Sequence, residues 1–290
     1  MTLEIHPQQP FGALVTGLSL AADIEADTLA RLREAWLNHQ VLSFPDQPLT
    51  HAQLERVTLM FGQFGEETYL RGLPEHPHVV AVERKPDETP KPFGTGWHSD
   101  WSFQQTPPAA TLLHSKIIPP SGGDTLFANG YLAYEALSQA RRKQIDALTV
   151  IHSARRSYSH AAFAAGGGKA RSMNIVPNDN AYAEQRHPMV RVHPETQRRA
   201  LWVNSVYSIA IDELPQLEGE QLLNELLQHA TLPEFTYRLT WQPDMLTIWD
   251  NRCLQHVATG GYDGYHRLMH RTTIAGDAPK GPTRDHKRDS

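Results

Sequence analysis

The chain has 290 residues, of which 40% are hydrophobic and 20% charged, the composition of an ordinary globular protein with a sizeable core. A formal net charge of −5 carries no basic surplus, so nucleic acid is not an expected partner. The single cysteine, Cys253, excludes disulfides within the chain and any zinc site built on several cysteines, and it suits a reducing, cytoplasmic location.

The N-terminal part predicts two helices that alternate with short strands. In chain order we expect a strand, a helix, a strand and a helix at residues 12–20, 27–38, 41–44 and 50–61. The helical segments carry apolar side chains at helical spacing, and Asp27 and Thr50 are the expected N-caps. The first ten residues, MTLEIHPQQP, lack the basic and apolar stretches of a secretory signal.

The remainder of the chain is dominated by predicted strands. They are separated by proline and glycine turns, with helices expected over 131–148 and 218–228. The strands are expected at residues 79–84, 111–118, 124–129, 189–194, 199–204, 235–241, 245–251 and 267–274. Many strands with few helices predict a mainly β protein with flanking helices, as a sandwich or barrel. No apolar run approaches the ~18 residues that span a bilayer, so no membrane contact is expected.

The segment 155–186 has many small residues, three successive glycines and little periodicity. Stretches of this length without structure are usually functional lids or disordered, and we expect a lid. We see neither an internal repeat nor a linker, so the prediction is one domain over residues 1–276. The charged residues 277–290 are expected to form a disordered tail.

The stretch TGWHSDWSF places His98 and Asp100 two residues apart, where an extended chain points both side chains to one face. His256, in WDNRCLQHVA, is the strongest candidate for a third ligand. Two histidines and one carboxylate form the facial triad of non-haem iron(II) oxygenases, which leaves positions for a cosubstrate and dioxygen. On spacing alone, the pair could equally be a solvated surface pair, and His98 a satisfied core histidine.

Two arginines share one face of the predicted strand 267–274. Arg267, Met269 and Arg271 point one way, with the two guanidinium groups roughly 13 Å apart along the strand. Arginine grips carboxylates in a bidentate manner, so two arginines that enter one cavity would bind two anions. The alternative is an outer face on which both arginines lie in water.

These motifs together identify a resemblance. WHSD, PPAATLL, SGGDTLF, WDNRCLQH and HRLMHRTTIAGD occur in the order and with the separations of the taurine dioxygenase (TauD/TfdA) family of iron(II)- and 2-oxoglutarate-dependent oxygenases. The chain resembles this family from about residue 11 to residue 277. The resemblance implies a double-stranded β-helix, the cupin-like jelly roll, with the iron inside it.

The resemblance also implies a role for individual residues. His98, Asp100 and His256 match the catalytic iron ligands, and Thr125 and Arg267 match the residues that bind 2-oxoglutarate. The implied reaction consumes dioxygen, converts 2-oxoglutarate to succinate and carbon dioxide, and hydroxylates a substrate. Because Asp100 is present, hydroxylation is expected rather than halogenation. Arg271 matches the residue that holds the acid group of the substrate.

Two departures from the taurine enzymes argue against taurine itself. Residues 61–72 lack the histidine that helps hold a sulfonate, and Gly94 stands where those enzymes place an asparagine. Aromatic residues beside Arg271 predict a bulkier apolar substrate body, although ordinary core packing explains them almost as well. The resemblance places Trp101, Phe103 and Tyr207 there, and Tyr69 and Arg71 of the divergent segment 61–72 could add substrate contacts.

We therefore expect a small anionic organic substrate: a sulfonate, a sulfate ester or an aryloxyalkanoate-like carboxylate. Hydroxylation next to oxygen or sulfur would give a product that collapses and cleaves the bond. The basic residues of the lid could attract such an anion or could only keep a loop solvated; they are Arg155, Arg156, Lys169 and Arg171.

Two other classes remain open. One is a zinc-type metallohydrolase that uses the same triad around an activated water, and the other is a non-catalytic jelly-roll module that binds a small acid. The resemblance also implies a homo-oligomer, a dimer or larger.

Overall fold

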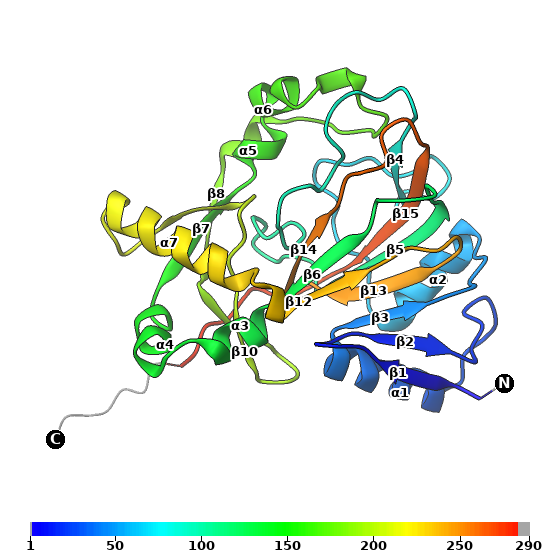
Figure 1. Cartoon of the computed structure of the whole chain (residues 1–290), viewed down its shortest axis with the longest axis horizontal. Helices are drawn as coiled ribbons and strands as arrows, with labels where there is room; N and C mark the ends of the chain where they lie inside the picture. The colour runs from blue at the N-terminus through cyan, green and yellow to red at the C-terminus, as the bar shows by residue number, and fades with distance from the viewer. Residues whose placement is uncertain (1, 284–290) are drawn as a thin grey trace.

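The computed structural model describes residues 2–283, and its centre is a pair of facing sheets (Figure 1). The large sheet has the order β1-β2-β3-β13-β5-β15-β4. Its strands are β1 (Glu4–Pro7), β2 (Ala13–Thr16), β3 (Val41–Phe44), β13 (Leu246–Asp250), β5 (Ala110–Ile117), β15 (Arg267–Ile274) and β4 (Val80–Arg84). The small sheet has the order β12-β6-β14, with β12 (Thr236–Leu239), β6 (Thr125–Asn129) and β14 (Leu254–Ala258). Only β2 and β3 pair in parallel within these two sheets of the described chain.

Side chains of the central strands point alternately to the two faces of the large sheet and so belong to two separate hydrophobic cores. Ile248 of β13 packs outward under α1 (Ala26–His39) and α2 (His51–Phe61), where Trp36 and Leu54 join it. The next residue, Trp249, points inward and packs with Phe127 of the small sheet. All five residues of β13 are buried, and its two polar residues have partners, Thr247 with Ser43 and Asp250 with Arg252. Two antiparallel sheets around an inner core, with helices outside, are the predicted jelly-roll arrangement.

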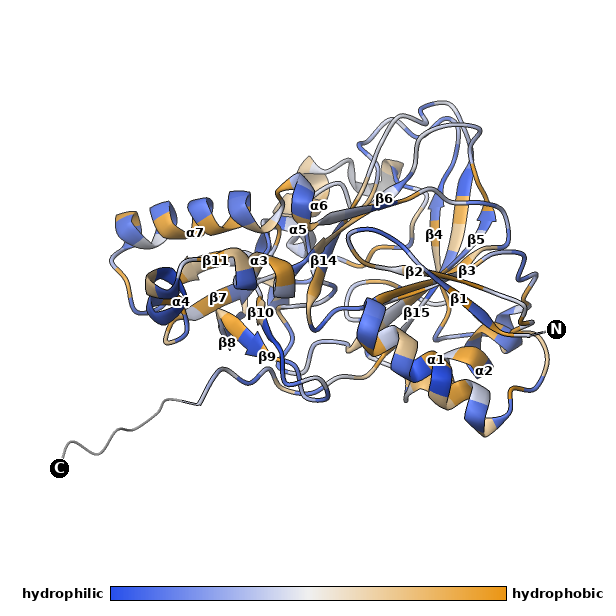
Figure 2. Cartoon of the chain, turned by 60° about the horizontal axis from the view of Figure 1, so that its bottom comes forward, coloured by the Kyte–Doolittle hydropathy of each residue, from blue (hydrophilic) through white to orange (hydrophobic). Residues whose placement is uncertain are grey.

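A second lobe extends from the sheets. It contains β7 (Thr149–Ser153) between β8 (Glu184–Pro188) and β11 (Ser208–Ile211), and a pair formed by β9 (Val190–Val192) and β10 (Arg199–Leu201). The helices α3 (Gly130–Ala136), α4 (Gln139–Ile145) and α7 (Gln216–Ala230) accompany it, and η3 (Pro233–Phe235) precedes β12. Figure 2 shows hydrophobic and hydrophilic residues alternating along α1 and α7, as expected of helices with one buried face.

The predicted lid segment is folded rather than structureless. It forms α5 (Arg155–Tyr158), α6 (His160–Ala165), η1 (Gly168–Ala170) and η2 (Asp179–Tyr182), at the top of Figure 1. The Val176 N–H donates to the Tyr69 carbonyl oxygen at 2.8 Å, and the Arg71 N–H donates to the Asn174 carbonyl oxygen at 3.2 Å. These bonds tie the lid segment to the loop between α2 and β4.

The predicted helix caps and one predicted helix differ in how well they match the structure. Thr50 caps α2 as predicted, in a capping box with Gln53. Asp27 as the cap of α1 is wrong, because the helix begins earlier and Glu25 occupies the cap position without a side-chain bond. The helix expected over 131–148 is two helices, because Ser138 caps the second of them.

The expected disordered tail is wrong for its first residues. The Val192 N–H donates to the Lys280 carbonyl oxygen at 2.7 Å, so residues around 280 run beside β9. Residues 284–290 of that prediction lie outside the described part of the chain. Among residues 2–283, no helix is long and apolar enough to cross a membrane.

Candidate metal and cosubstrate site

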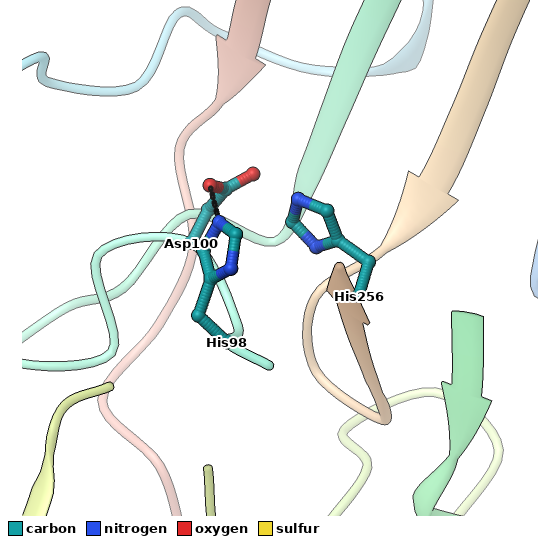
Figure 3. Close-up of side chains that lie close together, drawn as sticks. All are labelled: His98, Asp100 and His256. Carbon is teal, nitrogen blue, oxygen red and sulfur yellow. Dashed lines mark ion pairs between the residues drawn. The ribbon is translucent and has the colours of Figure 1, made fainter. Parts of the chain in front are cut away.

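His98, Asp100 and His256 meet between the two sheets, and Figure 3 shows their side chains pointing toward one another. Each offers one ligand atom, and these atoms lie within 4.8 Å of one another. The backbones of His98 and His256 form an antiparallel bridge, with N–H to carbonyl distances of 3.0 and 2.7 Å. All three side chains are buried, which excludes the solvated surface pair considered from the sequence.

A chain of hydrogen bonds orients Asp100. Thr111 of β5 donates its hydroxyl to Asp100 Oδ2 at 2.6 Å, and Asn251 Nδ2 donates to Thr111 Oγ1 at 2.9 Å. Trp249 Nε1 in turn donates to Asn251 Oδ1 at 3.0 Å. This leaves Asp100 Oδ1 on the side of His98, whose Nε2 lies 3.7 Å away. Partners of this kind fix the orientation of a metal ligand.

The protonation states of the three residues suit a metal. Burial alone would raise the pKa of Asp100, but Arg271 and the two histidines outweigh it and hold that pKa at about 2. Burial, with His98 beside it, lowers the pKa of His256 to about 3, and burial also lowers the pKa of His98. At neutral pH the site therefore presents a carboxylate and two neutral imidazoles, the forms that bind metals.

Several buried polar atoms of the site have no hydrogen-bond partner in the described part of the chain. Among the described residues, His256 Nδ1, Arg267 Nε and two nitrogens of Arg271 are buried without a hydrogen-bond partner. Such groups are costly unless a ligand, metal or water satisfies them. Two imidazoles and one carboxylate are a donor set that suits iron(II). The residues therefore fit iron(II) and an anionic cosubstrate.

A small inner cavity of about 50 Å³ joins the triad to the expected cosubstrate residues. Thr125 of β6 and Arg267 of β15 both line it. Arg267 Nη2 donates to the Gly123 carbonyl oxygen at 3.3 Å, and a side chain at Gly123 would crowd Arg267 Nε at 3.2 Å. Trp241 Nε1 donates to Thr125 Oγ1 at 3.0 Å. Arg267 and Arg271 both line this cavity, which excludes the outer face in water that the sequence left open.

Arg271 also lines the inner cavity, but two carboxylates already surround it. Its Nη2 lies 3.4 Å from Asp100 Oδ1 and 3.6 Å from Glu67 Oε1. Its guanidinium lies over the Trp101 ring, 5.1 Å from the centroid. Burial would lower the pKa of Arg271, but Asp100 and Glu67 raise it, so the guanidinium stays charged.

The predicted aromatic residues gather in one cluster, but they do not all face a cavity. Tyr207 lines an outer cavity of about 230 Å³, together with Tyr158 of the lid segment. Tyr69, Trp101 and Phe103 line neither of the two cavities and pack behind, with Tyr69 stacked on Tyr158 at 4.6 Å. For these three the structure favours the packing explanation.

The lid arginines point in different directions. Arg156 is exposed at the outer cavity, where its described hydrogen bond is a 3.5 Å contact to the Ser208 carbonyl oxygen. Arg155 pairs instead with Glu184 at 3.4 Å. Arg171 lines the outer cavity, yet its guanidinium donates to the carbonyl oxygens of Gly166 at 3.0 Å and Lys91 at 2.9 Å.

Sequence reasoning missed several residues of the site. Thr111 and Asn251 lie inside the quoted motifs PPAATLL and WDNRCLQH, so their position beside the ligands was the available signal. Glu67 lies in the segment without a recognisable motif, and no local pattern marks it. Phe93 lines both cavities with His98, and it stands directly before Gly94, the position already singled out from the sequence.

A jelly roll that holds two histidines and one carboxylate beside a buried arginine is typical of non-haem iron oxygenases. The sequence matches the family described as taurine catabolism dioxygenase TauD, TfdA family over residues 4–273. The chain belongs to this family, and it is a 2-oxoglutarate-dependent non-haem iron dioxygenase that uses iron(II), 2-oxoglutarate and dioxygen.

Relatives with named activities cover almost the whole chain. The alpha-ketoglutarate-dependent sulfate ester dioxygenase of Pseudomonas putida is 31% identical over 293 residues, which cover 97% of this chain and 92% of that protein. The (S)-phenoxypropionate/alpha-ketoglutarate-dioxygenase of Sphingobium herbicidovorans is 33% identical over 275 residues, 92% of each. The zinc hydrolase and binding-module alternatives are not favoured by these relatives.

Solved structures agree with the fold. A taurine dioxygenase from Burkholderia xenovorans aligns with a TM-score of 0.81 at 32% identity, covering 97% of this chain and 94% of that one. The enzyme AAD-2, solved in complex with Mn(II) and N-oxalylglycine, aligns with a TM-score of 0.78 at 30% identity, covering 96% and 99%. The predicted jelly-roll fold is confirmed.

Proposed function

We propose that this enzyme hydroxylates a small anionic organic substrate and that the residues between the two sheets carry out the reaction. The observation that carries the proposal is the convergence of the triad with Thr125 and Arg267 on one buried cavity. His98, Asp100 and His256 would hold iron(II), which supplies the dioxygen chemistry when bound. The single domain 1–276, with 155–186 as its lid, is part of the proposal.

Arg267 and Thr125 would bind the distal carboxylate of 2-oxoglutarate. Arg267 is buried, always charged, and has an unpartnered Nε among the described residues. A dicarboxylate in the inner cavity gives this charge the partner that burial demands. Thr125 adds a hydroxyl at the other side of the cavity, from the small sheet.

The outer cavity would hold the substrate, because His98 lines both cavities and connects the two spaces. Phe93, Tyr158 and Phe163 give this cavity apolar walls, and Arg271 lies near the metal ligands for an acid group. We propose a sulfate ester, a sulfonate or an aryloxyalkanoate-like carboxylate; a sulfate ester and a phenoxypropionate appear in the names of the two relatives. Hydroxylation at a carbon next to the ester or ether oxygen would lead to bond cleavage. A homo-oligomer and a cytoplasmic location stay predictions from the sequence.

The decisive experiment is an anaerobic titration of the iron(II)-loaded protein with 2-oxoglutarate. We expect the weak visible charge-transfer band of a 2-oxo acid chelated to iron(II). A panel of sulfate esters, sulfonates and aryloxyalkanoates is then screened for substrate-dependent succinate release. A protein that holds iron but shows no band would contradict the assignment of Arg267 and Thr125, and no succinate with any acid would contradict the substrate class.

A further inference from the structure

A largely buried carboxylate lies against the arginine that is expected to receive the acid group. The Glu67 side chain is 10% exposed, and its Oε1 lies 3.6 Å from Arg271 Nη2. Glu67 Oε1 also accepts a hydrogen bond from the Thr273 hydroxyl at 3.2 Å, and Oε2 accepts one from Trp101 Nε1 at 2.9 Å. Buried acids are rare unless they are paired, so this one calls for an explanation.

The backbone holds Glu67 in place. The Gly65 N–H donates to the Thr273 carbonyl oxygen at 2.9 Å, and the Ala275 N–H donates to the Gln63 carbonyl oxygen at 2.8 Å. A Cβ at Gly65 would lie 2.8 Å from Thr273 Oγ1, so the close approach requires glycine. The preceding segment is therefore fixed along β15, and Glu67 is not a mobile surface acid.

The charges around Arg271 leave no free positive charge for an incoming acid group. Asp100 and Glu67 lie on one guanidinium, at 3.4 and 3.6 Å. A metal at the triad would share the charge of Asp100 and leave Glu67 as the counter-ion of Arg271. An acid group that arrives at Arg271 then adds a second negative charge to a pair that is already neutral. In a buried site, an unpaired charge is very costly.

We propose that Glu67 takes up a proton when an acid group binds at Arg271, so that the site binds an acid together with one proton. Glu67 is therefore a specificity-determining residue: an acidic substrate binds only together with a proton on Glu67, whereas an uncharged analogue binds without that proton. The inference rests on the proposed function, since it requires an acidic substrate at Arg271. It extends that function by linking substrate affinity to pH.

The surroundings of Glu67 favour the uptake. Burial raises the pKa of Glu67, with Arg271 opposing the shift and Asp100 adding to it. The charged and titratable groups that act on it are Arg271 from β15, Asp100 from the WHSD segment and Tyr158 from α5. Once Arg271 pairs with the bound acid group, it no longer strongly lowers the pKa of Glu67, and Glu67 can take up a proton. The neutral acid keeps its hydrogen bond from Trp101.

Isothermal titration calorimetry in buffers of different ionisation enthalpy measures the proton directly. The protein is loaded with Mn(II) and N-oxalylglycine so that no turnover occurs, and the probes are hexyl sulfate and 2-phenoxypropionate. Both probes stay singly charged from pH 6.5 to 8.5. We expect the wild-type protein to take up close to one proton per acid bound, and its Kd to rise by up to tenfold per pH unit.

Glu67→Gln should bind the same acids about tenfold more tightly at pH 8, with no proton uptake and no pH dependence. Glu66→Gln is the matched control, because Glu66 is the adjacent acid and is exposed. Thr273→Val removes one hydrogen bond to Glu67 without changing its charge. Both controls should keep the proton uptake of the wild-type protein. If Glu67→Gln does not fold, Glu67→Ala takes its place and should likewise bind the acids without proton uptake.

Acid binding by the wild-type protein without proton uptake would overturn the inference and leave the proposed function intact. Equal uptake by wild type and Glu67→Gln would also overturn it, since the proton would then go elsewhere. If neither protein binds any acid of the panel, the proposed substrate class fails, and the inference fails with it.

Discussion

The two cavities that meet at His98 are built from different kinds of structure. Strands of both sheets form most of the inner cavity, and its polar residues are all buried: His98, Asp100, Thr125, His256, Arg267 and Arg271. About half of the residues that line the outer cavity come from the lid segment 155–186. That segment consists of helices of four to six residues, 3-10 turns, loops and the first residues of β8.

The inner cavity therefore determines the reaction, and the outer cavity determines which substrate is bound. Thr125, His256 and Arg267 are held by strand ladders, while a backbone bridge to His256 holds His98 and the Thr111 hydroxyl holds Asp100, so the geometry of metal and cosubstrate binding is rigid. Groups on short helices and loops change with little effect on the core, which makes the outer cavity the place where substrate selection is altered. Substitutions in the inner cavity should therefore remove the reaction, whereas substitutions in the outer cavity should change substrate affinity.

The largest effect is expected for Asp100→Ala. This change removes the only carboxylate of the triad, and we expect the rate of 2-oxoglutarate-dependent turnover to fall at least roughly 1,000-fold, about 4 kcal/mol. Bound iron should fall as well, which is measured by metal analysis after dialysis. Asp212→Ala is the control, because Asp212 forms an exposed pair with Arg186. Turnover close to wild type in Asp100→Ala would refute the ligand assignment.

Arg267→Gln should have the next largest effect, on the cosubstrate rather than on the metal. The variant loses a charged, bidentate partner of a carboxylate, so we expect the KM for 2-oxoglutarate to rise about 100-fold, roughly 2.7 kcal/mol. Iron content should not change. The control is Arg238→Gln, whose arginine pairs with Asp124 at 2.8 Å on the exposed side of the small sheet. If Arg267→Gln instead raised the KM for the substrate and left the KM for 2-oxoglutarate unchanged, Arg267 would bind the substrate, and the assignment of the two cavities would be the wrong way round.

The same difference explains what the sequence could predict. Arg267, Met269 and Arg271 alternate with outward residues on an eight-residue strand, so period-two reasoning placed them on one face. His98, Asp100 and His256 lie in the motifs WHSD and WDNRCLQH, which made them recognisable from the sequence. By contrast, α5 spans four residues, too few for periodicity to separate Arg155 from Arg156. Glu67 reaches Arg271 only through tertiary pairing with β15, which no local pattern records.

The smallest effect, and the sharpest comparison within the lid, is expected for the neighbouring arginines of α5. Arg156 is exposed at the outer cavity, whereas Arg155 pairs with Glu184 outside it. Because an exposed charge is screened by solvent, Arg156→Gln should raise the KM for an anionic substrate only about three- to tenfold, more at low than at high salt. Arg155→Gln should leave that KM unchanged, and neither variant should alter the KM for 2-oxoglutarate. Equal effects of the two variants would mean that the lid acts through its overall charge, and that the direction of Arg156 into the cavity carries no selectivity.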